Sequence, residues 1–467
     1  MSVQDLPEVC DVLVLGGGLA GTAAALAAAE AGAHVVQLEK QDAIGGSTVL
    51  SAGLSAFAGT DEQAEAGIED SDELLRDDII ATGFGKGDPA LVDLYCRHQR
   101  DTYRWLKGHG VRYGHLHAAA GQSVPRSHPT DTTRMLALLT AAAAELGASQ
   151  FTGIAARRLL REDDRVVGSL VEDATGARRE IRAGAVVLAT GGFARNRDML
   201  EKFAPQMRLA HQAGGQGNVG EGLQMAWALG ADVIDTPWIK GTYGVHPRPH
   251  AGEHGTGIHA IYKGGIAVNK QGMRFVDESL PYKVVGDANL AQTDGETWQV
   301  FDERVMAASD ASVAIFDFAG RRDCGILISA DSIEELAALM DVPAEALVGT
   351  VDEYNRRVAA GEPDQFGREH LSGRVGELFP LVAPPFHAHL SGTVVLATYC
   401  GLRVDTSMRV LDVFGQTIDG LHAVGEIIGG FHGGGYMTGT SIGKAGIFGR
   451  VAGQVAAAAV KGRVAHV

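Results

Sequence analysis

Residues 11–40 carry a pattern of apolar and small positions that is typical of two strands and a helix. The apolar run DVLVL is followed by the turn GGGLAG, an alanine-rich stretch, and a second apolar run that ends in the acid Glu39. Short apolar runs on either side of a stretch of helix-forming residues predict a strand, a helix and a second, parallel strand. We therefore expect one βαβ unit near the start of the chain.

The glycines of this unit have the spacing of a dinucleotide-binding turn. Gly16 allows the tight turn, Gly18 allows the backbone to approach a pyrophosphate, and Gly21 allows the helix to pack closely on the strand. The N–H groups at the start of the helix would bind the phosphates. Glu39 would accept a hydrogen bond from a ribose 2′-hydroxyl, and an acid there argues against a 2′-phosphate. NAD and FAD both fit such a unit.

Two further strand-and-turn patterns decide between these dinucleotides. Residues 185–193 (AVVLATGGF) predict a buried strand that ends in a second glycine turn, and residues 418–430 (IDGLHAVGEIIGG) predict a third. The segment GGST at 45–48 adds backbone donors directly after the acid. Three separated glycine turns favour a long, extended ligand such as FAD. Besides the residues named above, the predicted cofactor-binding residues are Leu19, Ala20, Lys40, Gly45, Gly46, Ser47, Thr48, Gly53, Thr190, Gly191, Gly192, Gly425, Glu426, Ser441 and Ile442.

The C-terminal region combines a glycine-rich loop with a helix of small residues. The loop contains one tyrosine, Tyr436, and the segment SIGKAGIFGRVAGQVAAAAV predicts a helix from about Ser441. The N-terminus of a helix carries partial positive charge. If it points at the flavin ring, it would stabilise the anionic reduced flavin.

Composition and charge restrict the class of ligand. With 40 basic and 57 acidic residues among 467, the formal charge is −17, which disfavours nucleic acid or an anionic membrane surface as a partner. The four cysteines lie far apart without a CxxC motif, so we expect reduced thiols in a cytoplasmic protein. The sequence shows no signal-peptide pattern and no apolar stretch long enough to span a membrane. A small molecule is the expected ligand.

Six segments together resemble the FAD-dependent flavoproteins that include fumarate reductase, succinate dehydrogenase and the 3-ketosteroid dehydrogenases. They are GGGLAG, LEKQDAIGGST, ATGGF, GNVGEGLQMAWALGADV, VNKQGMRFVDES and LHAVGE. The resemblance implies an α/β fold, in which residues 1–235 and 385–467 form a Rossmann-like FAD-binding domain and residues 236–384 an inserted α+β capping domain. Respiratory members tether the flavin through a histidine near the GGST position. No histidine stands there in this chain, so non-covalent FAD is expected.

The residues that bind dicarboxylates in fumarate reductases are replaced here. The motif RFVxE is present at residues 274–278, but Tyr282 stands four residues later, where the family has the arginine that delivers a proton. In the family's HGxxR motif the arginine is replaced by Tyr436, and HTMGG reads ATYCG at residues 397–401. The resemblance to fumarate reductases therefore does not extend to the substrate clamp.

Tyrosines at both positions resemble the 3-ketosteroid dehydrogenases and related cyclic-ketone desaturases. That resemblance implies that Tyr282 removes the proton α to a carbonyl. It also implies that Tyr436 hydrogen-bonds the carbonyl oxygen, with the backbone of Gly439 or Thr440. The chemistry is consistent, because one well-placed donor to a developing enolate oxygen contributes about 3–4 kcal/mol. A phenol with a pKa near 10 is a poor base at pH 7, so Lys283 or a second tyrosine would have to lower it.

Four more residues are candidate substrate contacts. His246 precedes a proline, as a substrate-facing histidine of the family does, and Tyr243 is a candidate helper phenol. Arg126 and His128, in VPRSHPTD, could reach flavin or substrate or could lie in a solvated loop. Purely structural roles stay open for these residues and for Tyr282 and Tyr436. The other candidate helper phenols are Tyr103 and Tyr113.

The histidines of HPRPHAGEHGTGIH look at first like a metal cluster. They are His246, His250, His254 and His259. Their loop is interrupted by proline and glycine and lacks helical ligand spacing, so no metal is expected.

The sequence thus predicts an FAD-dependent enzyme that desaturates a ketone, whether a monocyclic ketone, a keto acid or a 3-ketosteroid. Two alternatives stay open: reduction of an activated alkene (an enone or a fumarate-like compound) and a flavin redox sensor without turnover. No haem motif, iron–sulfur cysteines or second Rossmann turn are found, so the electrons are expected to leave to an external quinone-like acceptor or oxygen.

Overall fold

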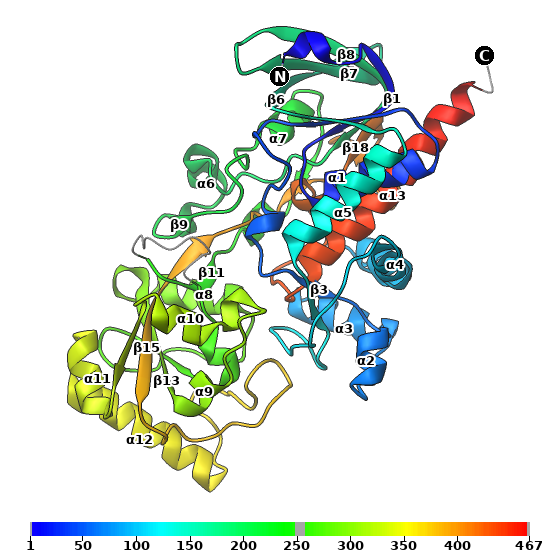
Figure 1. Ribbon diagram of the computed structural model, residues 1–467. Coiled ribbons are helices and arrows are strands. Elements are labelled where there is room, and N and C mark those ends of the chain that lie inside the picture. Colours follow the sequence, from blue (N-terminus) through cyan, green and yellow to red (C-terminus); the bar gives the residue numbers. More distant parts are fainter. Residues whose placement is uncertain (1, 248–256, 465–467) are drawn as a thin grey trace.

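The computed structural model describes residues 2–247 and 257–464 and has two lobes (Figure 1). One lobe is built from both ends of the chain, shown in blue to green and in red. The other comes from the middle of the chain, shown in green to yellow, and lies below it in this view. This is the predicted mixed α/β architecture, with a dinucleotide-type domain and an inserted cap.

The first lobe is organised by an eight-stranded sheet with the order β17-β18-β7-β8-β1-β2-β5, in which β6 pairs with β7. Strands β5, β2, β1, β8 and β18 run parallel. β2 is buried along its whole length, as expected for a parallel strand covered on both faces. The strands are β1 (Val9–Leu15), β2 (Val35–Glu39), β5 (Ser149–Thr152), β6 (Ile154–Glu162), β7 (Arg165–Asp173), β8 (Arg178–Leu188), β17 (Arg409–Leu411) and β18 (Thr417–Ala423).

Two helices of small residues pack side by side in this lobe. They are α1 (Leu19–Glu30) and α13 (Thr440–Val464), which run next to each other in Figure 1. A β-carbon at Gly449 or Gly453 would overlap the backbone of α1 at Ala20 or Ala24. The small side chains are therefore required for the close approach of the two helices, and the predicted βαβ unit and C-terminal helix are confirmed.

The remaining elements of this lobe surround that core. The helices are α2 (Asp61–Glu65), α3 (Asp72–Thr82), α4 (Pro89–Gly108), α5 (Thr132–Glu145), α6 (Arg197–Phe203) and α7 (Glu221–Trp227). Two short strands, β3 (Leu54–Ala56) and β4 (Ser127–Pro129), pair antiparallel. None of the helices in the described ranges is long and apolar enough to cross a membrane.

The cap is built around β15 (Phe386–Val395), which is buried at every position. β11 (Thr242–Val245), β13 (Glu296–Asp302) and β14 (Leu327–Ala330) pair antiparallel with it, β9 (His211–Gln212) pairs parallel, and β12 (Ile266–Val268) adds to β13. The helices are α8 (Tyr282–Leu290), α9 (Glu303–Ala307), α10 (Phe318–Asp323), α11 (Ile333–Met340) and α12 (Ala344–Ala360).

The sheet of the cap corrects the predicted end of the cap at residue 384. β15 belongs to this sheet, so the chain leaves the cap only after Val395. β9 joins the same sheet from before the predicted start at 236. Strand pairing over such sequence distances could not be seen in the local pattern.

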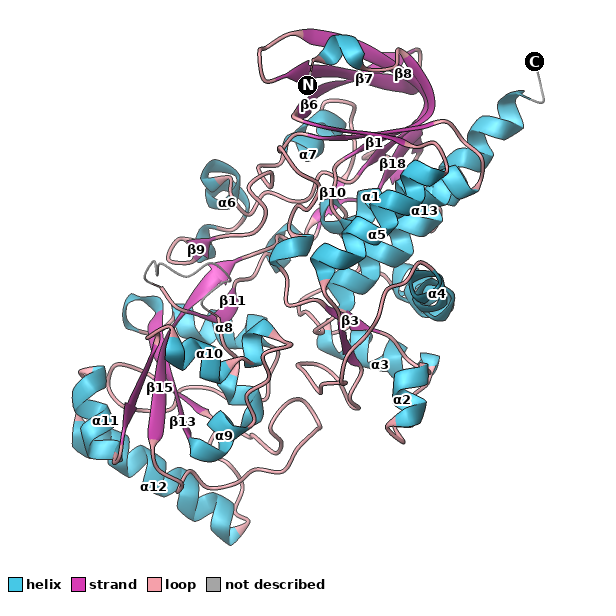
Figure 2. Cartoon of the chain, viewed as in Figure 1, coloured by secondary structure: helices cyan, strands magenta, loops and turns pink. Residues whose placement is uncertain are grey.

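Two of the crossings of the chain between the lobes, the one before β11 and the one after β15, lie together. β10 (Val233–Ile234), labelled in Figure 2, pairs antiparallel with β16 (Gly401–Leu402) at this point. Asp235 and Tyr399, next to these strands, have left-handed backbone conformations with φ of 68° and 54°. Non-glycine residues adopt this conformation at a cost and often near functional sites.

Candidate functional site

The turn between β1 and α1 has the shape that a dinucleotide requires. Gly16 has φ of +120°, and β-carbons at Gly16 and Gly21 would overlap Ala189 and Gly16 respectively. Gly18 differs, because a β-carbon there would meet no protein atom closer than 3.6 Å, the distance to Thr48 Oγ1. The protein itself therefore does not require glycine at position 18, whereas close approach of a ligand to the backbone would.

The acid at the end of β2 closes this turn. Glu39 is buried, and its carboxylate accepts hydrogen bonds from the N–H groups of Gly17 (2.7 Å) and Gln41 (2.8 Å). Each carboxylate oxygen has two lone pairs, so one ribose hydroxyl can still be accommodated. Lys40 turns away and forms an ion pair with Glu221.

The GGST segment is tied into the protein by its hydroxyls. Thr48 Oγ1 accepts the N–H of Leu19 at 3.0 Å, at the first residue of α1. Ser47 Oγ accepts the N–H of Gly215 and the side-chain amide of Asn218, both at 3.0 Å. These two hydroxyls thus support the turn and join it to residues 215–218. Gly46 has φ of +56°, and Gly45 donates its N–H to Gly17 O.

Gly53 was predicted to bind the cofactor, but the fold itself already requires a glycine at this position. Its φ is +71°, and a β-carbon would overlap the carbonyl oxygen of Thr130.

The two other predicted glycine turns meet at Glu426, which joins them. Its carboxylate accepts hydrogen bonds from the N–H of Thr398 (3.1 Å) and from the Asn218 amide (3.0 Å). β-Carbons at Gly191 and Gly192 would overlap Asn218 and the Thr398–Glu426 pair respectively. Gly425 has φ of +81° and Ala20 as its neighbour, while Ile442 packs partly buried on the core.

Two hydroxyls near this junction are buried without a hydrogen-bond partner among the described residues: Thr190 Oγ1 and Thr398 Oγ1. Unpaired buried hydroxyls are costly unless a ligand or water completes them. Together with the open side of Gly18, they fit a bound FAD. Bound there, FAD would be held by the start of α1, by Glu39 and by residues 190–192 and 425–426.

The two tyrosines predicted to do the chemistry meet at the boundary of the lobes. Tyr282 opens α8 in the cap, and Tyr436 lies in the loop before α13. Their ring centroids are 5.7 Å apart with an interplanar angle of 56°, and each side chain is 8% exposed. Positions 154 residues apart in the chain thus form one aromatic cluster.

The oxygen of Tyr436 is supported by backbone donors. It accepts the N–H of Gly439 at 3.3 Å and the N–H of Ser441, in the first turn of α13, at 3.5 Å. Thr440 donates both its N–H and its hydroxyl to Met437 O. The prediction that Gly439 or Thr440 donates directly to substrate therefore differs from the structure: one N–H supports the phenol, and the other closes the turn.

These contacts separate the acidities of the phenols. Burial raises the pKa of Tyr282 well above its usual value near 10, and the nearby phenols of Tyr436 and Tyr399 raise it further. Burial also raises the pKa of Tyr436, but the hydroxyl and N–H of Ser441 and the N–H of Gly439 oppose the rise. Both phenols therefore keep their protons at pH 7.

A buried ion cluster fixes the segment that leads to Tyr282. Glu278, fully buried, accepts from both Nε (2.9 Å) and Nη2 (2.6 Å) of Arg274 and from Arg368 (3.3 Å). Glu278 also accepts the N–H of Ala267 in β12. The RFVxE motif is therefore an anchor in this chain, and it sets the position at which α8 begins.

Sequence reasoning missed a third phenol in the cluster, Tyr399. Its ring stacks on Tyr436 at 5.1 Å and 27°, and the ammonium of Lys283 lies 4.5 Å from its centroid. Of the predicted helper phenols, Tyr103 bonds Glu62, Tyr113 stacks on Tyr103, and Tyr243 bonds Thr297. The sequence signal for Tyr399 was the segment ATYCG, which contains it. Only the missing histidine of that segment had been interpreted.

The expectation that Lys283 or a second tyrosine lowers the pKa of Tyr282 is wrong, because the neighbouring phenols raise that pKa and Lys283 is bonded elsewhere. Its ammonium donates to Thr242 Oγ1 (2.8 Å) and Lys240 O (3.1 Å). Burial lowers its pKa to about 7.

Two histidines border the cluster as neutral rings. His259 stacks on Tyr282 at 4.8 Å and pairs through Nε2 with Tyr243 O, and burial lowers its pKa to about 4. His432 forms a T-shaped pair with the Tyr399 ring, with centroids 4.7 Å apart, and burial lowers its pKa well below 6.5. These two histidine neighbours of the phenols are therefore uncharged at pH 7, whereas Lys283, beside the Tyr399 ring, is partly protonated there.

The other predicted substrate contacts have structural partners instead. Arg126 is fully buried between Asp70 and Asp78, and His128 bonds Thr60 Oγ1 and Arg126 O. Neither lies in a solvated loop, and their polar atoms are bonded within the protein. His246 packs against the ring of His389.

His250 and His254 lie outside the described residues. Within residues 2–247 and 257–464, no group of three or more candidate ligands is arranged to hold a metal ion.

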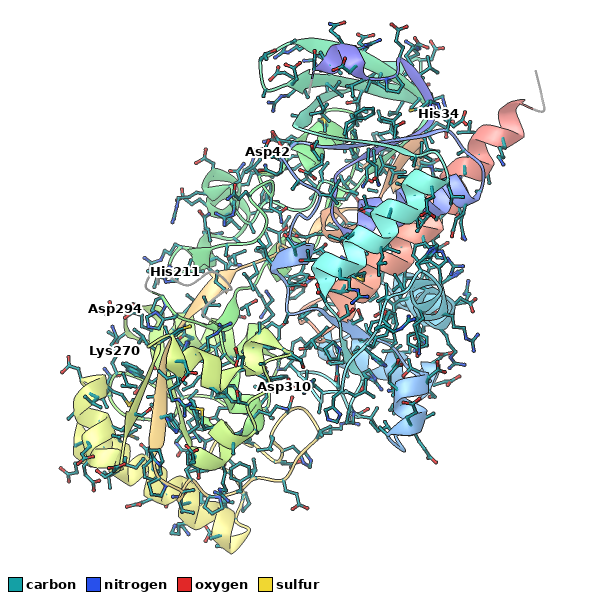
Figure 3. The ribbon with its side chains drawn as sticks, viewed as in Figure 1. His34, Asp42, His211, Lys270, Asp294 and Asp310 are labelled. Atoms are coloured by element: carbon teal, nitrogen blue, oxygen red, sulfur yellow. The ribbon has the colours of Figure 1, made fainter. Side chains whose placement is uncertain are left out.

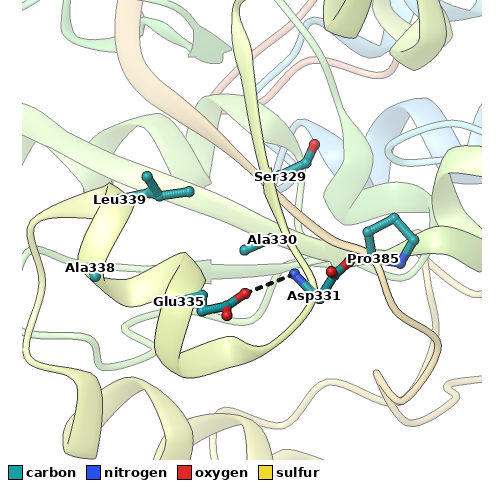
Figure 4. A pocket seen from close by; sticks show the side chains of 7 residues that line it. All are labelled: Ser329, Ala330, Asp331, Glu335, Ala338, Leu339 and Pro385. Atoms are coloured by element: carbon teal, nitrogen blue, oxygen red, sulfur yellow. Dashed lines mark hydrogen bonds between the residues drawn. The ribbon is translucent and has the colours of Figure 1, made fainter.

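A surface depression of about 530 Å³ lies elsewhere, on the cap (Figure 4). It is lined by Ser329, Ala330, Asp331, Glu335, Ala338, Leu339 and Pro385. None of the predicted site residues borders it, so it is separate from the phenol cluster.

Comparisons with known proteins agree with this geometry. A model of the family described as "FAD binding domain" matches residues 11–442. A probable fumarate reductase of Shewanella frigidimarina is 30% identical over 458 residues, which cover 96% of this chain and 75% of that protein. A vinyl phenol reductase of Lactiplantibacillus plantarum is 29% identical over 480 residues, or 96% of each protein.

Among solved structures, a 3-ketosteroid-Δ4-(5α)-dehydrogenase from Rhodococcus jostii RHA1 is similar over 98% of this chain and 99% of that chain. The TM-score is 0.77 and the identity is 27%; that structure contains 4-androstene-3,17-dione.

Proposed function

Because this chain belongs to the FAD binding domain family and is an FAD-dependent oxidoreductase, we propose that it introduces an α,β double bond into an uncharged ketone. The observation that carries the proposal is the cluster in which Tyr282 from the cap meets Tyr436 from the loop before α13. Bound FAD would supply the acceptor for the β-hydride. The residues of the chain then have to bind the carbonyl oxygen and move one proton.

Tyr436 is the proposed donor to the carbonyl oxygen. Its oxygen accepts two backbone N–H groups, which favour the build-up of negative charge on that oxygen as the phenol donates its proton to the substrate. A donor directed at a developing enolate contributes about 3–4 kcal/mol to lowering the barrier. The α-proton becomes removable through this interaction.

Tyr282 is the proposed base. Its raised pKa makes it a strong base once it is ionised, although only a small fraction is ionised at pH 7. The ionised oxygen of Tyr282 would take the α-proton and become the neutral phenol, and FAD, when bound, would accept the β-hydride, which leaves the enone. An external quinone-like acceptor or oxygen would then reoxidise the flavin.

An uncharged substrate is favoured by the surroundings of the cluster. The positions at which fumarate reductases carry arginines hold Tyr282 and Tyr436 here. The adjoining histidines, His259 and His432, are neutral at pH 7. A dicarboxylate would lack its counter-charges, whereas a cyclic ketone needs only the donor, the base and apolar walls.

Reduction of an uncharged alkene is the second candidate. The neutral phenol cluster suits it equally well, and the similarity to a vinyl phenol reductase supports it. In this direction Tyr282 would donate a proton instead of accepting one.

Anaerobic mixing with a panel of cyclic ketones distinguishes the two candidates and also the flavin redox sensor. A desaturase should lose its visible flavin absorbance and yield the enone. An alkene reductase, once reduced with dithionite, should be reoxidised by alkenes and should not be bleached by saturated ketones. A sensor without turnover should respond to neither.

A further inference from the structure

Tyr399 sits in the crossing between the lobes after β15, in a strained backbone conformation. It follows β15, which ends at Val395, and precedes β16, which begins at Gly401. Its φ of 54° is uncommon for a bulky side chain. An unusual backbone conformation of this kind persists only where surrounding contacts fix it. For Tyr399, these contacts include Tyr436.

The contacts of the Tyr399 ring are with the residues of the site. It stacks on Tyr436 with centroids 5.1 Å apart at 27° and forms a T-shaped pair with His432 at 4.7 Å and 74°. Near-parallel and edge-to-face arrangements at these distances are favourable for aromatic pairs. Tyr399 itself is only partly buried, whereas Tyr436 is 8% exposed.

Lys283 holds the Tyr399 ring as well. Its ammonium lies 4.5 Å from the ring centroid and is oriented by its bonds to Thr242 Oγ1 and Lys240 O. Up to its pKa of about 7 Lys283 carries a positive charge, and a desolvated cation at this distance from an aromatic ring attracts it. The ring of Tyr399 is thus held by an element of the cap while it packs on the C-terminal loop.

The hydrogen bonds to Tyr436 are too long to fix its ring alone. The distances of 3.3 Å and 3.5 Å from the Gly439 and Ser441 nitrogens exceed the 2.7–3.2 Å usual for N–H···O bonds. The three residues before Tyr436 in this loop are glycines, which have no side chains to pack on its ring. Orientation of the phenol therefore depends on ring packing.

We propose that Tyr399, with Lys283 at its ring, is a positioning residue for Tyr436. This rests on the proposed role of Tyr436 as donor to the substrate. The ring of Tyr399, not its hydroxyl, performs the task, and the cap takes part through Lys283. Closure of the cap onto the C-terminal loop and alignment of the donor are thereby linked.

Replacement of Tyr399 by Phe and by Leu separates ring from hydroxyl. Tyr399→Phe keeps the stack and should retain kcat within about threefold. Tyr399→Leu should lower kcat at least tenfold with little change in KM and unchanged FAD content. Equal kcat in Tyr399→Leu and wild type would overturn the proposal. So would a loss in Tyr399→Phe as large as in Tyr436→Phe, because the hydroxyl would then act directly.

A spectroscopic measurement tests positioning without any turnover. 3-Fluorotyrosine placed at position 436 should give one narrow fluorine resonance in the FAD-loaded wild type and in Tyr399→Phe. In Tyr399→Leu the resonance should broaden or split, because the ring samples several orientations. An unchanged resonance in Tyr399→Leu contradicts the proposal. If no ketone or alkene reacts but the resonance responds as described, the proposed function fails while the positioning role stands.

Discussion

In the proposed reaction, the hydroxyl of Tyr436 lowers the barrier more than any other single group of the protein. Tyr436→Phe removes the donor to the enolate oxygen and keeps the ring. Loss of one such donor typically lowers kcat by about 10²- to 10³-fold, and FAD content should be unchanged. Stopped-flow measurement of flavin reduction by a reactive ketone checks this.

The matched control is Tyr354→Phe. Tyr354 is a buried phenol of α12 whose hydroxyl has no partner among the described residues. Removal of its hydroxyl should leave flavin reduction within about twofold of wild type. Similar losses in both variants would mean that the Tyr436 hydroxyl contributes only to packing.

The acidity of Tyr282 predicts the pH dependence of flavin reduction. Its pKa lies well above 10, so the ionised fraction grows about tenfold with each pH unit below that value. The rate of flavin reduction should therefore rise from pH 7 to pH 10 without a plateau. A plateau below pH 8 would identify a base other than this phenol.

Lys283 predicts a pH dependence of stability. Its pKa is about 7 when folded, against about 10.4 in an unfolded chain. Between these values the unfolded chain binds a proton that the folded protein lacks, so the free energy of unfolding rises with pH. Lys283→Met should make that rise less steep in urea titrations at pH 7, 8 and 9.

Lys270 is the control for this measurement. It lies at the surface of the cap, near Asp294, to which it donates at 2.7 Å (Figure 3). The ion pair with Asp294 raises the pKa of Lys270, so Lys270→Met should keep the wild-type slope over this range. If Lys283→Met keeps that slope as well, the ammonium of Lys283 is not buried as described.

The loop that enters α13 is the element on which the site depends most. Gly439 has φ of +91°, and a β-carbon there would lie 2.7 Å from the backbone nitrogen of Ala56 in β3. Gly439→Ala should lower the free energy of unfolding by about 1–3 kcal/mol. It should also slow flavin reduction more than tenfold, because it displaces an N–H that supports Tyr436.

Gly462→Ala, near the other end of α13, provides the comparison. A β-carbon at Gly462 meets no atom within 4 Å. Alanine there should be neutral or stabilising by up to about 1 kcal/mol. Thermal unfolding of both variants shows whether the loop before α13 or the helix itself is sensitive.

The elements that local pattern determines could be predicted, and those that depend on distant partners could not. The βαβ unit and α13 follow from runs of apolar and small residues, and the contacts of Gly449 with Ala20 explain why small residues are needed. The membership of β15 in the cap depends on its pairing with β11, β13 and β14. No local signal marks that pairing.

The residues of the candidate site likewise divide into those that the local sequence indicates and those that depend on distant partners. Tyr282 and Tyr436 could be chosen because they replace arginines at fixed spacings. Tyr399 could not, because only the folding of the crossing after β15 brings its ring to Tyr436. Arg126 and His128 looked available in the sequence, yet the partners that bury them, Asp70 and Thr60, are far away along the chain.

The molecule as a whole is an FAD lobe with a cap that contributes half of the proposed chemistry. The GGST segment contains no histidine, and Ser47 and Thr48 bond within the protein. FAD should therefore be released intact when the protein is denatured with acid. A yellow supernatant with a colourless pellet is expected, and flavin that stays with the pellet would show a covalent link.

The proposed reaction requires that a saturated ketone reduce the bound flavin. The most direct measurement is the visible absorbance of the FAD-loaded protein, mixed without oxygen with saturated cyclic ketones, followed by mass spectrometry of the product. We predict bleaching by at least one uncharged cyclic ketone and recovery of its enone, two hydrogens lighter. If no ketone bleaches the flavin and alkenes rapidly reoxidise the reduced protein, the proposed desaturation of a ketone is contradicted.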